Sequence, residues 1–311
     1  MPDPIRTVLV VGAGAVGAAV AALIAERRPG AVSILAGGER AGRYRRDGFL
    51  LNGSRRDFPI VSPEESSAPD LLIVAVKTHQ LDAAIADMSR HVGRRTLVLS
   101  LLNGISSEES LAGAFGAEKV PLAMILGIDA VREGNATRFS GRGKIHFGDP
   151  LNREGAWSER VRRIAAFFQE CQVPFVVPPD MVRSLWFKFM VNVGINQASA
   201  VLRAPYGAFQ VPGDARDIME SAMRETVALS QALRTGLGEE DVASWGDTLG
   251  ALAPDGKTSM LQDVEARRKT EVDAFAGTVL ALAEPRGLAV PVNRTLYRLI
   301  RAIERGMTTA D

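Results

Sequence analysis

The first half of the chain alternates short apolar runs with stretches of helical spacing. This alternation predicts a parallel β-sheet that is covered by helices. The runs that we expect to form strands are residues 7–11, 32–35, 71–76, 96–99, 120–126 and 173–177.

Two turns that contain glycine predict hairpins in the same half. Asn52-Gly53 separates the runs 49–51 and 57–61, and Asn-Gly between apolar runs is a strong hairpin signal. Gly141-Arg142-Gly143 separates residues 137–140 from residues 144–147 in the same way. We expect each pair of runs to form a small antiparallel insertion.

The pattern changes after Pro178-Pro179, where two prolines stop the last strand. Beyond them, residues 180–202, 215–234 and 260–283 carry helical spacing, and no segment convincingly alternates with period two. We therefore predict an α/β domain over residues 1–178, followed by an all-helical domain over residues 179–311.

Charge and composition narrow the class of protein. The 311 residues include 37 Lys and Arg against 36 Asp and Glu, a net charge of +1, which gives no reason to expect nucleic acid or an anionic membrane as partner. The single cysteine, Cys171, cannot form an internal disulfide, as is usual in the cytoplasm. A lone cysteine could also be a nucleophile, but we expect Cys171 to be a buried structural thiol. His79, His91 and His146 show no metal-ligand spacing, so we expect no metal site.

Residues 7–25 are almost uninterruptedly apolar, about the length of a membrane span. Three glycines within six residues favour a strand, a tight turn and a buried helix instead. The segment also lacks the charged region and the cleavage site of a signal peptide. We therefore expect a cytoplasmic protein without a membrane partner.

The glycines belong to the motif Gly12-Ala13-Gly14-Ala15-Val16-Gly17, between the first strand and a helix. In a Rossmann-type fold, Gly12 permits the tight turn, Gly14 lets a pyrophosphate approach the backbone, and Gly17 allows close packing of helix on strand. The N-terminus of the helix then attracts the phosphates. The alternative is a glycine-rich turn that binds nothing. We expect a dinucleotide to contact Gly12, Gly14, Ala15, Val16 and Gly17.

The end of the second strand favours NADP(H) over NAD(H). No acidic residue occurs in Leu35-Ala36-Gly37-Gly38 to bind a ribose 2′-hydroxyl, and the basic residues that follow could bind a 2′-phosphate. Arg40 and Arg43 lie one helical turn apart, and Arg40 is our candidate contact. Two alternatives stay open: a solvated basic helix face, and Glu39 as the acid of an NAD-type site.

Two other strands end in polar residues. Lys77 directly follows the run 71–76, and Asn103 follows the run 96–99 after a few residues. Ligands bind at the carboxyl edge of such a sheet, so both side chains are candidates for ligand contacts. Ordinary loop polarity is the alternative.

Residues 183–202 form a predicted helix with apolar side chains in nearly every direction. Lys188, Asn192 and Asn196 are spaced at i, i+4 and i+8, and so form one polar stripe. Buried polar groups need partners or must line a cavity, because unpaired burial costs several kcal/mol. A stripe that faces the substrate is favoured over a purely structural hydrogen-bond network.

Together these motifs resemble the ketopantoate reductase (2-dehydropantoate 2-reductase) family over essentially the full length. The resemblance depends on GAGAVG, the Val-Lys at a strand end, Leu-Leu-Asn-Gly, Trp-Phe-Lys-x3-Asn-x3-Asn, and the segments 258–263 and 270–273. It implies NADPH-dependent reduction of 2-dehydropantoate (ketopantoate) to pantoate, a step of pantothenate biosynthesis. It also implies Lys188 as the proton donor and Lys77 and Asn103 near the cofactor. The substrate-binding residues that it implies are Asn103, Asn192, Asn196, Ser259 and Glu271.

The chain departs from the family pattern at three positions. It has Leu102 where Gln is usual, Gln197 where Pro is usual, and Gly37 where many members carry Arg. The exact 2-keto acid therefore stays open, with a reductase of another 2-keto acid or a non-catalytic dinucleotide sensor as alternatives. The helical domain could pack internally or against a second copy, so a homodimer also stays open.

One distance constrains the site. On a single straight helix the Cα atoms of Ser259 and Glu271 would be ~18 Å apart, too far for a small keto acid to bridge. We therefore expect Ser259 in a loop that begins at Asp255-Gly256.

Overall fold

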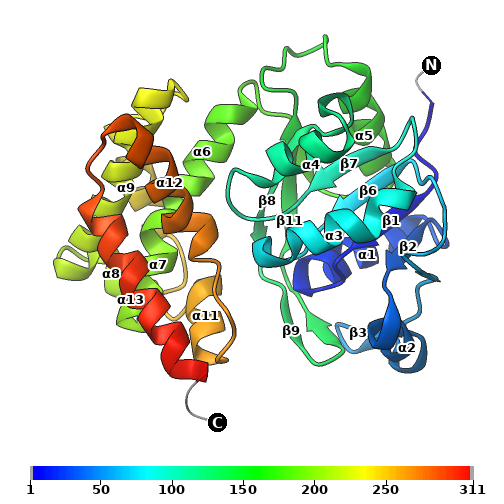
Figure 1. Ribbon diagram of the computed structural model, residues 1–311, viewed down its shortest axis with the longest axis horizontal. Coiled ribbons are helices and arrows are strands. Elements are labelled where there is room, and N and C mark those ends of the chain that lie inside the picture. Colours follow the sequence, from blue (N-terminus) through cyan, green and yellow to red (C-terminus); the bar gives the residue numbers. More distant parts are fainter. Residues whose placement is uncertain (1–2, 309–311) are drawn as a thin grey trace. The chain divides into compact units, whose positions relative to one another are not determined.

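The computed structural model describes residues 3–308 (Figure 1). The chain divides into two compact units, Met1–Val182 and Arg183–Asp311. The predicted fold class is confirmed, because the first unit is α/β with a parallel sheet and the second is helical. The division lies inside helix α6 (Met181–Val191), whereas the sequence placed the domain boundary before that helix.

The main sheet of the first unit is entirely parallel, with the strand order β5-β2-β1-β6-β7. From β1 the chain first builds strands on one side and then crosses to β6 on the other. The carboxyl end of β1 beside β6 is therefore the switch point at which open α/β sheets bind ligands. The strands are β1 (Val8–Val11), β2 (Val32–Leu35), β5 (Ile60–Val61), β6 (Leu71–Val74) and β7 (Leu97–Ser100).

Helices follow the strands of this sheet, as the alternating pattern predicted. Helix α1 is buried from Gly17 to Ile24, which explains why its sequence is as apolar as a membrane span. Among the described residues, no helix is both long enough and apolar enough to cross a membrane. The helices of this unit are α1 (Ala15–Arg27), α2 (Gly38–Asp47), α3 (Leu81–Met88), α4 (Ser107–Phe115) and α5 (Glu159–Glu170).

In two smaller sheets the strands pair differently from the two predicted hairpins. The turn at Asn52-Gly53 exists, with φ angles of 47° and 81°, but its second arm is β4 rather than residues 57–61. The second hairpin was wrong, because β10 pairs with β3 and β9 while β11 pairs with β8 and β12. The strands are β3 (Phe49–Leu51), β4 (Ser54–Arg56), β8 (Leu122–Ile128), β9 (Val131–Glu133), β10 (Ala136–Arg138), β11 (Arg142–Gly148) and β12 (Phe175–Val176).

Asp129 gives the physical reason for the second correction. Its carboxylate accepts hydrogen bonds from the backbone N–H groups of Ser140 and Gly141 at 2.8 and 2.7 Å. These bonds and the Ser140 hydroxyl hold the pKa of Asp129 below its ordinary value, against the opposing effect of burial. The chain after β10 is therefore bound to the end of β8, and β11 continues along β8.

The second unit is built from helices alone among its described residues. The predicted helix 180–202 is confirmed, except that a π-turn, η4, interrupts it at Asn192–Asn196. The elements are α6, η4, α7 (Gln197–Leu202), α8 (Gly207–Gln210), α9 (Asp214–Leu233), α10 (Glu239–Gly250), α11 (Ser259–Glu265), the π-turn η5 (Asp273–Gly277), α12 (Thr278–Ala283) and α13 (Pro291–Thr308). The helical spacing over 260–283 belongs to separate elements, α11, η5 and α12, because the chain turns at Arg267, which has a φ of 54°.

Candidate active site

The glycine motif forms the turn from β1 to α1. Gly12 has a φ of +91°, and a Cβ atom there would lie 2.6 Å from Val76 Cγ1. A Cβ on Gly17 would lie 2.1 Å from the carbonyl oxygen of Gly12, so only glycine permits this packing of helix on strand. The expected tight turn at Gly12 and the expected close packing at Gly17 are confirmed. A Cβ on Gly14 would meet only Ala75 O, at 4.0 Å, so space remains above the backbone where a pyrophosphate would approach.

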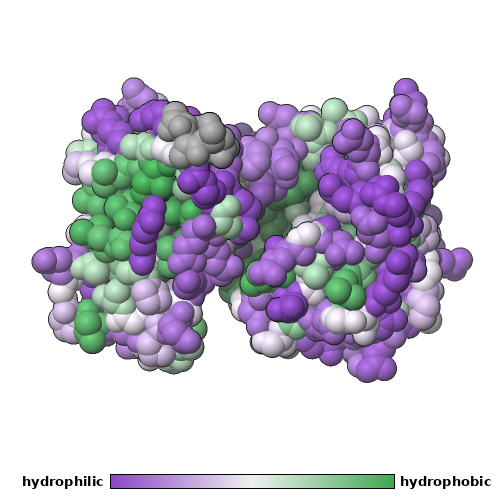
Figure 2. Space-filling view, turned by 90° about the horizontal axis from the view of Figure 1, so that it is seen from below, coloured by the Kyte–Doolittle hydropathy of each residue, from purple (hydrophilic) through white to green (hydrophobic). Residues whose placement is uncertain are grey.

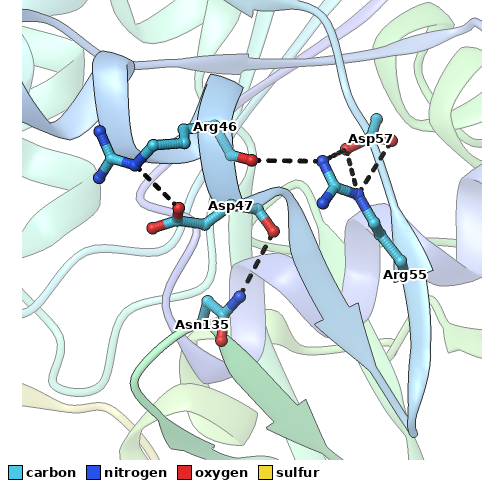
Figure 3. A network of polar contacts seen from close by, with 5 residues as sticks. All are labelled: Arg46, Asp47, Arg55, Asp57 and Asn135. Carbon is cyan, nitrogen blue, oxygen red and sulfur yellow. Dashed lines mark hydrogen bonds and ion pairs between the residues drawn. The ribbon is translucent and has the colours of Figure 1, made fainter.

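Helix α2 begins where β2 ends, and its arginines differ in what they contact. Arg46 forms an ion pair with Asp47 at 3.0 Å, and its carbonyl accepts a hydrogen bond from Arg55 at 3.4 Å (Figure 3). The guanidinium of Arg43 lies over the ring of Tyr44, 5.8 Å from its centroid. Arg40 in the first turn is exposed and makes no hydrogen bond or ion pair among the described residues.

Lys77 and Asn103 lie after β6 and β7, at the same edge of the sheet as the glycine turn. The backbone N–H of Lys77 donates to Gln80 Oε1 at 3.2 Å, which fixes the start of the short helix after β6. The loop that carries Asn103 is closed by a bond of 2.7 Å between the hydroxyls of Ser100 and Ser107, both of them buried. The side chains of Lys77 and Asn103 are half-buried.

The helical unit brings three of its four predicted substrate residues into one hydrogen-bonded chain. Asn196 Nδ2 donates to Asn192 Oδ1 at 3.1 Å. Asn196 Oδ1 accepts from Ser259 Oγ at 3.1 Å and from the backbone N–H of Met260 at 3.2 Å. Lys188 is half-buried and precedes Asn192 by one helical turn. The polar stripe is thus real and extends to a segment distant in the sequence.

Ser259 reaches this chain in a way that the sequence did not indicate. It is the first residue of α11, after the cap residue Thr258, whose hydroxyl accepts the N–H of Leu261 at 3.2 Å. The expectation that Ser259 lies in a loop was wrong. The reason for doubting one straight helix was sound, because α11 ends at Glu265 and the chain reverses before Glu271.

Glu271 is 7% exposed and lies two residues before η5, the second π-turn. Its neighbour Thr270 is held by Glu304 of α13, whose carboxylate accepts from the Thr270 N–H at 2.9 Å and from its hydroxyl at 2.7 Å. On the other side, Tyr297 donates to Asp273 Oδ1 at 2.9 Å, a bond that raises the pKa of Tyr297. Helix α13 therefore fixes the segment that carries Glu271.

The two π-turns, Glu304 and helix α13 were missed in the sequence. π-turns are rare and often occur at functional sites. Each one here contains a glycine, Gly194 or Gly277. A Cβ on Gly194 would lie 2.5 Å from Met223 Cγ, so the first π-turn packs directly on α9. A glycine in an otherwise apolar helix next to asparagines was the one signal that could have marked it.

Cys171 is buried at the end of α5, as expected, and desolvation raises the pKa of its thiol to about 11. It is therefore a thiol rather than a thiolate near neutral pH. No group of three or more His, Cys, Asp or Glu residues that could hold a metal ion occurs within residues 3–308.

An α/β unit with this strand order and a glycine turn at its switch point, followed by a helical unit, is an architecture of dinucleotide-dependent oxidoreductases. The family model for Ketopantoate reductase PanE/ApbA matches residues 8–152, and the model for its C-terminal part matches residues 180–304. This chain belongs to the ketopantoate reductase PanE/ApbA family, whose members are oxidoreductases.

Relatives and solved structures agree with this placement. The chain is 31% identical to the 2-dehydropantoate 2-reductase of Vibrio cholerae over 78% of this chain and 80% of that protein. It is 28% identical to that of Halobacterium salinarum over 96% and 99%, respectively.

Two structures share the fold at 21% identity. D-mandelate dehydrogenase with NADH and anilino(oxo)acetate has a TM-score of 0.86, with coverage of 97% of this chain and 100% of the other. Dimeric ketopantoate reductase from Staphylococcus aureus has a TM-score of 0.81, with coverage of 97% and 99%.

Proposed function

We propose that this enzyme reduces 2-dehydropantoate (ketopantoate) to pantoate with NADPH, with Lys188 as the proton donor. The observation that carries the proposal is the hydrogen-bonded chain Asn192, Asn196 and Ser259 beside Lys188. It combines a cation and two amides from one largely apolar helical segment with a hydroxyl from the start of α11. That set suits a small molecule with a carbonyl next to a carboxylate.

The first unit supplies the cofactor contacts in this proposal. The backbone at Gly12, Gly14, Ala15, Val16 and Gly17 would hold the pyrophosphate, and the space above Gly14 fits that approach. Arg40 would bind the 2′-phosphate, with Lys77 and Asn103 near the rest of the cofactor. NADPH, when bound, supplies the hydride that adds to C2 of the keto acid.

The chain's own residues would manage the charge that then forms. Negative charge grows on the C2 oxygen, and the Lys188 ammonium stabilises it and transfers a proton to it, which gives the hydroxyl of the product. The Asn192 and Asn196 amides orient the keto acid, together with Asn103. The Ser259 hydroxyl, which has a single proton, would turn from Asn196 to donate to the carboxylate, and Glu271 would accept a hydrogen bond from the hydroxyl that distinguishes ketopantoate from simpler keto acids.

We also propose that the enzyme is a homodimer, joined through an apolar groove of about 300 Å³ on the helical unit. The space-filling view shows apolar residues gathered on that unit (Figure 2). Leu202 and Leu299 at the groove are each 44% exposed. The groove is lined by Ala198, Val201, Leu202, Ile218, Pro291, Val292, Thr295, Leu296 and Leu299.

Charge complementarity favours a second copy as the occupant of this groove. Exposed Asp214 and Asp217 lie in the first turn of α9, and exposed Arg294 and Arg298 lie on α13; both helices contribute lining residues to the groove. None of the four has an ion pair among the described residues. A two-fold axis through the groove would pair acids with bases, and the S. aureus relative is described as dimeric.

The test of the activity is oxidation of NADPH and NADH by the purified enzyme against a panel of 2-keto acids. The panel contains ketopantoate, 2-ketoisovalerate and an aromatic 2-keto acid. Turnover of ketopantoate with NADPH supports the proposal. Preference for the aromatic acid would instead make the enzyme a reductase of another 2-keto acid, and no oxidation with any acid would favour a non-catalytic sensor.

A further inference from the structure

Gln197, the first residue after the π-turn η4, is wholly buried at 0% exposure. Its side-chain Nε2 donates to the carbonyl oxygen of Val193 at 2.7 Å and to Asn293 Oδ1 at 3.1 Å. A buried amide of this kind is costly unless it is hydrogen-bonded. Its placement between the turn and α13 therefore needs an explanation beyond packing.

The orientation of this amide follows from its neighbours. Glu225 of α9 accepts from the backbone N–H groups of Val292 and Asn293 at 2.8 and 2.9 Å. It also accepts from Asn293 Nδ2 at 2.8 Å. A carboxylate that accepts all these bonds fixes Asn293 with its Oδ1 toward Gln197, and so directs Nε2 of Gln197 toward Val193. The polar chain runs from Glu225 through Asn293 and Gln197 to the π-turn.

The bond to Val193 replaces one that a regular helix would make. In an α-helix, the backbone N–H of residue 197 would donate to the carbonyl of residue 193. Here that N–H donates to Gly194 instead, and the side chain of Gln197 takes its place at Val193. The side chain of Gln197 thus satisfies the Val193 carbonyl in place of the backbone N–H of residue 197. If that N–H bonded Val193 again, the π-turn would become an α-turn.

We propose that Gln197 is a positioning residue, which holds η4 as a π-turn and thereby sets the directions of Asn192 and Asn196. This inference rests on the proposed function of those two asparagines. A π-turn contains one residue more per turn than an α-turn. Relaxation would remove that extra residue from the turn and change the direction of Asn196 relative to the start of α11 by up to about 100°, one residue's share of a turn. The bonds from Ser259 Oγ and from the backbone N–H of Met260 to Asn196 Oδ1 would then be lost.

Two variants separate positioning from simple stability. Gln197→Leu and Gln197→Pro both remove the donor to Asn293, so both leave the same buried group unpaired. Leucine keeps the backbone N–H of residue 197, which can then return to Val193 and close an α-turn. Proline has no N–H, and its ring excludes the carbonyl four residues earlier. The φ of −72° at residue 197 already suits proline.

The experiment measures KM for ketopantoate, KM for NADPH, kcat and melting temperature for both variants. We expect Gln197→Leu to raise KM for ketopantoate about 10-fold or more, the factor that corresponds to a lost well-placed hydrogen bond. KM for NADPH should stay unchanged. Gln197→Pro should keep KM for ketopantoate near the wild-type value, although its melting temperature falls as far as that of the leucine variant.

Equal loss of ketopantoate binding in both variants, or no loss in either, would overturn the proposal. Crystal structures of the two variants give a readout that does not depend on activity. Residues 192–196 should form an α-turn in the leucine variant and a π-turn in the proline variant. If the wild type reduces no 2-keto acid, the proposed function fails, and these structures still decide whether Gln197 holds the turn.

Discussion

Asn196 Oδ1 accepts a hydrogen bond from Ser259 Oγ at 3.1 Å, although the two residues lie 63 positions apart in the chain. This bond joins the helix of Lys188 to the start of α11. It also means that Ser259 is held in place by the protein itself. The cluster is therefore organised before a substrate binds, which reduces the entropy that binding must overcome.

Replacement of Lys188 by alanine should lower kcat by on the order of 10²- to 10⁴-fold, the usual scale for a lost general acid. Because the proposed cofactor contacts belong to the first unit, the dissociation constant for NADPH should change little. Lys144→Ala, at an exposed lysine of β11, is the matched control. Near-normal turnover of the Lys188 variant would rule out its role as proton donor.

Replacement of Arg40 by alanine should weaken NADPH binding and leave NADH binding nearly unchanged, because the guanidinium would contact only the 2′-phosphate. Arg45→Ala is the control, since Arg45 is an exposed arginine further along the same helix. Dissociation constants for both cofactors provide the measurement. An equal loss for NADPH and NADH would show that Arg40 is only a surface charge.

Glu271→Ala should cut kcat/KM for ketopantoate by about 10- to 200-fold, because a hydrogen bond to a charged group contributes roughly 1.5–3 kcal/mol. The same variant should reduce kcat/KM for 2-ketoisovalerate, which lacks the hydroxyl, far less. Glu304→Gln serves as a comparison, because Glu304 holds the adjacent Thr270. If the ratio of kcat/KM for ketopantoate to kcat/KM for 2-ketoisovalerate is the same in wild type and variant, Glu271 does not recognise the hydroxyl.

Leu299→Arg should convert a dimer into a monomer, because it places a charge in the apolar groove. Sedimentation equilibrium measures the mass directly. Leu151→Arg is the control, since Leu151 is 74% exposed on the first unit. A monomeric wild type, or a Leu299 variant that stays dimeric, would contradict the proposed interface.

The parallel sheet could be predicted from the sequence because its buried strands form apolar runs between helical patterns. The glycine turn could be predicted because only glycine adopts the φ of Gly12 and fits at Gly17. The strands with which β10 and β11 pair could not be predicted, since these pairings depend on Asp129, whose bonds are formed only in the folded chain.

In the candidate site, too, some features could be predicted from the sequence and others could not. The stripe Lys188, Asn192 and Asn196 could be predicted because helical spacing places i and i+4 side by side. The link from Asn196 to Ser259 could not, because it depends on how α11 packs against the π-turn. The contact of Glu304 with Thr270 was missed for the same reason, because Glu304 lies on α13, 34 positions later in the chain.

The most direct test of the central proposal is the ratio of kcat/KM for ketopantoate to that for 2-ketoisovalerate, measured with NADPH on the wild-type enzyme. We expect clear turnover of both acids and a ratio of about 10 or more, which corresponds to the Glu271 hydrogen bond. A ratio near or below one would contradict recognition of ketopantoate, and no NADPH oxidation with either acid would contradict the proposed reaction itself.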